Sequence, residues 1–87
     1  MLRITTMENG PEQVLKLEGK LQGPWTGELI RSCRQARSTS EQVLLDLSAI
    51  TFIDTAGVVA LRELQQMGVS IGRSSPFVSE MLKRNRE

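Results

Sequence analysis

Two aspartates near the middle of the chain, Asp46 and Asp54, carry side chains that can do chemistry. A pair of carboxylates acts as general acid and general base when both reach one substrate. These two are eight residues apart, on either side of an apolar run. No acid, base or metal partner is evident for them in the sequence. The favoured interpretation is that Asp46 accepts hydrogen bonds from backbone donors near the end of a strand.

The counts of histidine and cysteine exclude most other reactive sites. The chain has no histidine and one cysteine, Cys33. Ser-His and Cys-His arrangements and the usual zinc sites therefore lack their main residue, and an internal disulfide is excluded. Cys33 is expected to be a small buried hydrophobe. We predict a protein that is not an enzyme, with no catalytic residue, no metal site and no cofactor.

Three arginines, Arg31, Arg34 and Arg37, recur at helical spacing and offer a different kind of chemistry. Such a stripe can bind a phosphate backbone or an acidic partner. The formal net charge is +1, and no aromatic residues are interleaved with these arginines. A solvated helix face is therefore the favoured interpretation, and we predict no binding of nucleic acid.

The single tryptophan, Trp25, has two interpretations. A large amphipathic ring can be the anchor of a protein interface. Trp25 also falls in helical register with Leu29 and Cys33, which favours a place in the core.

The length of 87 residues allows one domain with one core. No apolar run approaches the roughly 18 to 20 residues that span a bilayer, and no signal-peptide core follows Met1. We expect a cytoplasmic protein that is not inserted in a membrane.

Periodicities of two and of 3.6 residues predict the elements that position these side chains. Strands alternating with helices indicate right-handed crossovers and a mostly parallel sheet, with one antiparallel edge from the first hairpin. The class is α/β with the order β-β-α-β-α-β-α. The expected elements are strands near 2–7 and 13–21, a helix near 24–37, a buried run over 43–53, a helix from 54 to 67, a short strand at 69–72 and a helix opened by Ser75-Pro76. Asp54 is a residue type that favours the N-cap of the helix that starts there.

The predicted core follows the same periods. Val43 to Leu47 form a nearly continuous apolar run that is typical of a central strand, and the run is expected to stay buried through Phe52 and Ile53. The two later helices are expected to face the core with Val58, Leu61, Leu64 and Met67, and with Phe77, Val78, Met81 and Leu82.

The segment over residues 43–57 resembles the core motif of STAS domains. It reads Val43-Leu44-Leu45-Asp46-Leu47-Ser48-Ala49-Ile50-Thr51-Phe52-Ile53-Asp54-Thr55-Ala56-Gly57. Leu17-Glu18-Gly19-Lys20-Leu21 is similar to the second strand of that family. The resemblance runs from about residue 2 to residue 84. It implies a sheet with strands in sequential order and helices mainly on one face. STAS domains usually continue into a further strand and helix, so the resemblance implies a single STAS-like domain over 1–87, shortened at its C-terminal end.

The resemblance also implies a site. In the anti-sigma-factor antagonists of this family, a partner kinase phosphorylates the serine after the aspartate, and that position falls on Thr55. Asp54, Thr55, Ala56, Gly57 and Val58 are the implied partner-binding residues. A phosphate on Thr55 would lie at a helix N-terminus, where the dipole favours negative charge. The alternative interpretation is that the Thr55 hydroxyl only caps the helix.

Two functions follow from the resemblance. The first is a bacterial regulator of transcription, an anti-sigma-factor antagonist that binds an anti-sigma factor or related serine/threonine kinase and is switched by phosphorylation at Thr55. The second is an accessory subunit that docks on the ATPase of an ABC-type lipid transporter, because Asp54-Thr55-Ala56-Gly57 is also similar to those subunits. Both functions need a protein partner and no cofactor.

Overall fold

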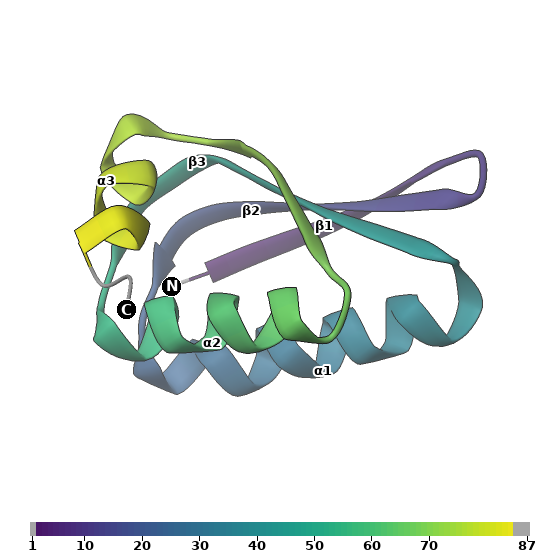
Figure 1. The fold of residues 1–87 in the computed structure, drawn as a ribbon, viewed down its shortest axis with the longest axis horizontal. Helices are drawn as coiled ribbons and strands as arrows, with labels where there is room; N and C mark the ends of the chain where they lie inside the picture. Colours follow the sequence, from purple (N-terminus) through teal and green to yellow (C-terminus); the bar gives the residue numbers. More distant parts are fainter. Residues whose placement is uncertain (1, 85–87) are drawn as a thin grey trace.

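The chain forms a four-stranded sheet in the order β1-β2-β3-β4, with α1 and α2 over one face and α3 at one end (Figure 1). The computed structural model describes residues 2–84. Element order and class are as predicted. The elements are β1 (Leu2–Asn9), β2 (Glu12–Leu21), α1 (Gly23–Thr39), β3 (Gln42–Ile53), α2 (Thr55–Gln66), β4 (Ser70–Ser74) and α3 (Pro76–Arg84).

Strand pairing is mixed, as the alternation of strands and helices predicted. β1 and β2 form an antiparallel hairpin in which Ile4 lies opposite Leu17. β2 pairs with β3, and β3 with β4, in parallel. Each parallel pair is joined by one helix, which runs back along the sheet before the next strand begins. The carboxyl ends of β2 and β3 therefore meet at the end of the sheet where α1 and α2 start (Figure 1).

The core lies between the sheet and the two long helices. In β2 and in the first half of β3 the completely or almost completely buried residues alternate, while the neighbours Val14 and Leu44 are only half-buried. This period of two shows that the helices cover one face of the sheet. The buried residues include Leu15, Leu17, Leu45 and Leu47 from the strands, Leu29, Cys33 and Ala36 from α1, and Val58, Leu61 and Leu64 from α2.

Two extra residues in β3 shift its register with β2 near the ends of both strands. Gly19 has a φ of 104°, and the pairing with β3 shifts on either side of it. The Thr51 hydroxyl donates to the Gly19 carbonyl at 3.1 Å. Beyond the shift, Leu21 again lies opposite Ile53, and both side chains are buried against the helices. The two strands thus reach the start of α2 with their last residues facing inward.

Three aromatic residues predicted to be in the core are partly exposed instead. Trp25, Phe52 and Phe77 have exposed fractions of 36%, 38% and 42%. Trp25 is in the first turn of α1, which starts just beyond the last residue of β2. Phe52 follows the register shift, which leaves its neighbour Ile53 as the inward-facing residue. The Phe52 and Phe77 rings stack with centroids 6.2 Å apart.

Candidate functional site

The turn between β3 and α2 is organised by the side chain of Asp54. One carboxylate oxygen, Oδ1, accepts from the Gly57 backbone N–H at 2.8 Å, which makes Asp54 the N-cap of α2 as predicted. The other oxygen, Oδ2, accepts from the Gly23 N–H at 3.0 Å, at the start of α1. The Asp54 N–H donates to the Leu21 carbonyl at 3.2 Å. A single residue therefore ties together the ends of β2 and β3 and the starts of both long helices.

Gly57 allows α2 to begin this close to the sheet. It is buried, and a Cβ at this position would lie 2.8 Å from the Leu21 carbonyl oxygen and 2.8 Å from Ile53 Cγ1. Backbone cannot yield to such an overlap as a flexible side chain can. Val58, the next residue, is 1% exposed and belongs to the core. Of the five residues implied to bind a partner, Gly57 and Val58 therefore offer no side-chain surface.

Thr55 and Ala56 are the members of the motif that face solvent. Within residues 2–84, the Thr55 hydroxyl makes no hydrogen bond, because Asp54 takes the N–H that a capping side chain would accept from. The prediction that Thr55 caps the helix is therefore wrong. The prediction that Thr55 accepts a phosphate is compatible with its exposure and stays a prediction.

Apolar side chains are exposed at the same end of the molecule. Trp25 lies in the first turn of α1, Val59 is 49% exposed on α2, and the stacked pair Phe52 and Phe77 joins the end of β3 to the start of α3. Figure 1 shows the starts of α1 and α2 side by side at this end, next to α3. We call Trp25, Phe52, Val59 and Phe77 the apolar end residues. Exposed aromatic and branched side chains of this kind are typical of protein interfaces.

The other reactive groups are placed where they cannot cooperate. Burial raises the pKa of the Cys33 thiol to about 11, so the thiolate nucleophile does not form at neutral pH. Asp46 Oδ1 accepts from the Ser48 N–H at 3.0 Å and from its hydroxyl at 2.7 Å, and these bonds lower the pKa of Asp46. Asp54 is eight residues further along the chain, roughly 26 Å in an extended strand. The two carboxylates form no catalytic pair.

The described residues offer no metal site in place of a catalytic carboxylate pair. Over residues 2–84, His, Cys, Asp and Glu side chains nowhere gather in a group that could hold a metal ion. None of the helices in that same range is long and apolar enough to cross a membrane.

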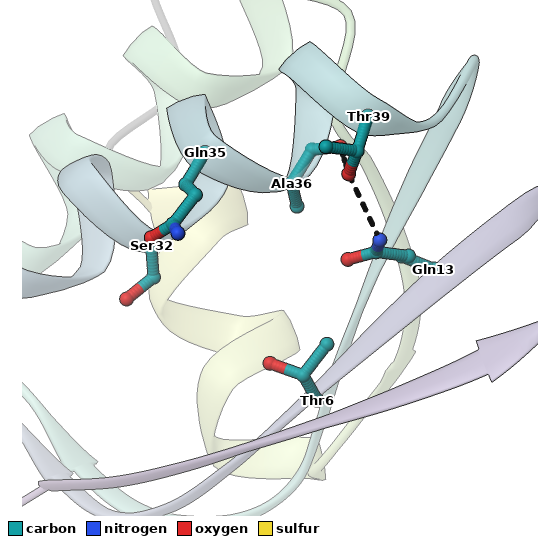
Figure 2. Close-up of a pocket in the computed structure, with 6 residues that line it drawn as sticks. All are labelled: Thr6, Gln13, Ser32, Gln35, Ala36 and Thr39. Carbon is teal, nitrogen blue, oxygen red and sulfur yellow. Dashed lines mark hydrogen bonds between the residues drawn. The ribbon is translucent and has the colours of Figure 1, made fainter.

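A polar groove lies away from this end, between the hairpin and the second half of α1 (Figure 2). Its volume is about 280 Å³, and Gln13 Nε2 donates to Thr39 Oγ1 across it at 3.1 Å. No pattern in the sequence predicts the groove, because its residues come from three separate elements. The lining residues, none of them charged, are Thr6, Gln13, Ser32, Gln35, Ala36 and Thr39.

Comparisons with known proteins agree with this architecture. The sequence matches the family model described as STAS domain over residues 4–79. A search of curated proteins finds no match. The structure is similar to that of an anti-sigma factor antagonist from Mycobacterium paratuberculosis, with a TM-score of 0.84 and 13% identity over 97% of this chain and 77% of that one.

The structure is also similar to two structures of SpoIIAA. One is described as the anti-sigma factor antagonist SpoIIAA in its unphosphorylated form, and the other as the Bacillus cell fate determinant SpoIIAA in the phosphorylated form. The unphosphorylated form has a TM-score of 0.66 over 95% of this chain and 82% of that one. The phosphorylated form has a TM-score of 0.65 over 97% and 82%. Sequence identity is 18% to both, so the likeness is one of fold.

Proposed function

The chain belongs to the STAS domain family, and on that premise we propose that it is a non-catalytic regulatory module of the anti-sigma-factor antagonist type. Its partner in this proposal is an anti-sigma factor or a related serine/threonine kinase. The observation that carries the proposal is the exposed Thr55 side chain, whose hydroxyl is free of hydrogen bonds within residues 2–84. Thr55 stands on a turn that Asp54 and Gly57 hold in place.

Phosphorylation of Thr55 would change the surface without unfolding the domain. A phosphate adds roughly 1.5 to 2 negative charges. The Asp54 carboxylate already occupies the Gly57 N–H, so the new charge would stand beside an existing one. On the solvent side its neighbours are Ala56 and Val59, which are exposed. A partner fitted to this small, uncharged surface would have to desolvate a dianion, and binding would be lost.

The second candidate is an accessory subunit of an ABC-type lipid transporter. The apolar end residues favour it, because permanent complexes have more hydrophobic interfaces than transient ones. In that case the partner would be the transporter's ATPase, and Thr55 would be a contact residue that is never modified.

The test is to purify the tagged full-length chain from its native cells and to identify its partner by mass spectrometry. Thr55→Glu is expected to weaken binding at least tenfold, whereas Thr55→Ala is expected to bind normally. Thr5→Glu, at an exposed threonine of β1, is the matched control and should bind normally as well. Equal binding of Thr55→Glu and wild type would exclude a phosphate switch. Co-purification with an ATPase and a permease would favour the second candidate.

A further inference from the structure

A pocket between α2 and α3 has a lining that contains two cationic side chains. Its volume is about 240 Å³, and it is lined by Arg62 and Gln65 from α2 and by Leu82 and Lys83 from α3. Arg62 and Gln65 are three residues apart, so they share one face of α2. No carboxylate is among these four residues. The positive charge of the pocket is therefore not neutralised by its own lining.

The guanidinium of Arg62 is only partly satisfied by the protein. Nη2 donates to the Leu82 carbonyl at 2.7 Å, which holds the end of α3 against α2. Nε is buried and has no acceptor among the described residues. A guanidinium has five N–H donors and no acceptor. Buried donors in native proteins are nearly always paired, so Arg62 keeps donor capacity that the described residues do not use. Nε itself is closed to solvent, so a ligand in the pocket would be bound through the terminal Nη groups.

Lys83 places a second positive charge on the rim of the same pocket. Its side chain is exposed and can follow a ligand, while Arg62 is held in position by Leu82. Two like charges around one small space disfavour each other unless an anion lies between them. The carboxamide of Gln65 adds another N–H donor from the α2 side.

We propose that this pocket is a binding site for a small oxyanion, a carboxylate or a phosphate group. The fixed Arg62 guanidinium supplies a planar set of donors that suits both groups. Lys83 supplies a mobile point charge, and Gln65 supplies a neutral donor. The site lies about two helical turns along α2 from Thr55 and involves none of the motif residues. It is independent of the function proposed above, and its failure would leave that function untouched.

The test is a titration of the full chain with sodium phosphate and, separately, with sodium acetate, followed by the backbone amide NMR signals. Ionic strength is held constant, because screening alone weakens charge interactions. We expect saturable shifts at Arg62, Gln65 and Lys83 with at least one of the two probes. The tighter of the two probes identifies the class of oxyanion. No saturable shift with either probe would overturn the proposal.

Variants separate a built site from general attraction to positive charge. Lys83→Gln leaves the bond between Arg62 and Leu82 in place, so it should keep the melting temperature and weaken binding at least threefold. Arg31→Gln removes an exposed cation on α1 and should bind as wild type does. If Lys83→Gln binds normally, or if Arg31→Gln weakens binding equally, Arg62 and Lys83 only complement the C-terminal end of α3, and the proposal is wrong.

Discussion

At the scale of single residues, the motif combines structural and exposed positions within four residues. Asp54 and Gly57 hold the turn together, whereas Thr55 and Ala56 between them face solvent. The sequence was sufficient to predict Asp54 as the N-cap, because capping depends on neighbours in the chain. It could not show the second bond, to Gly23, because that contact joins residues 31 apart. Nor could it show that the Thr55 hydroxyl does not cap the helix, since Asp54 accepts from the same Gly57 N–H.

Asp54→Ala is expected to lower the free energy of unfolding by about 1 to 3 kcal/mol, since two helix starts lose an acceptor and each cap is worth about 0.5 to 2 kcal/mol. Asp46→Ala is the matched control. Among residues 2–84 its carboxylate accepts hydrogen bonds only from the nearby Ser48, so its loss should cost under about 1 kcal/mol. Urea denaturation of both variants measures the difference. Equal losses would mean that the bond to Gly23 contributes little.

Gly57→Ala is expected to destabilise the protein by about 1 to 3 kcal/mol, because the added Cβ would overlap the Leu21 carbonyl and Ile53. Gly27→Ala provides the contrast. Gly27 also lies within a helix, but a Cβ there meets nothing within 4 Å. That substitution should stabilise the protein by about 0.5 to 1 kcal/mol through helix propensity. Thermal unfolding of the pair tests the close approach, and a neutral Gly57→Ala would contradict it.

Cys33 should be unreactive in the folded protein, because it is buried and its pKa is raised to about 11. A thiol reagent at pH 8 should label it only after denaturation. The raised pKa means that the folded state holds the thiol proton more tightly than the unfolded state does. The contribution of the Cys33 thiol to the free energy of unfolding is therefore fully present below about pH 9 and is lost towards pH 11. The loss is at most about 1.4 kcal/mol per pH unit. In Cys33→Ala the free energy of unfolding should not show this part of the decline with pH. Identical slopes of stability against pH in the variant and the wild type would contradict the raised pKa of Cys33.

At the scale of elements, the spacing of apolar residues predicted each helix and strand of residues 2–84. The errors concern aromatic residues that lie at the ends of these elements. Helical spacing assigns Trp25 and Phe77 to buried faces, yet both lie in first turns. A period shows which face of a helix is apolar, but it does not show how far the sheet extends beneath that face. Phe52 was misplaced for a related reason, since a register shift in a strand leaves no mark on the apolar pattern.

Leu45→Ala is expected to cost about 2 to 5 kcal/mol, because Leu45 is completely buried in the inner strand β3 and its truncation leaves a cavity. Leu44→Ala, one residue earlier and half-buried on the other face, should cost clearly less. Chemical denaturation compares the two. A loss under about 1 kcal/mol for Leu45→Ala, or equal losses for both, would contradict the observed one-sided core.

At the scale of the whole molecule, topology followed from the sequence because each strand pairs with the one before it. Right-handed crossovers leave few arrangements for strands that alternate with helices. Surfaces formed by elements that are distant in the chain could not be predicted from the sequence. The groove of Figure 2 and the pocket around Arg62 each need the relative placement of separate elements, which no local pattern encodes.

The sequential strand order also has a consequence during synthesis on the ribosome. Leu15 of β2 lies beside Leu45 of β3, which is made thirty residues later. At about 5 to 20 residues per second, the emerging β2 waits roughly 2 to 6 seconds for that neighbour. Throughout that interval its edge is open to pairing with other nascent chains. The charges of Lys16, Glu18 and Lys20 alternate along this strand and make such pairing unfavourable until β3 arrives.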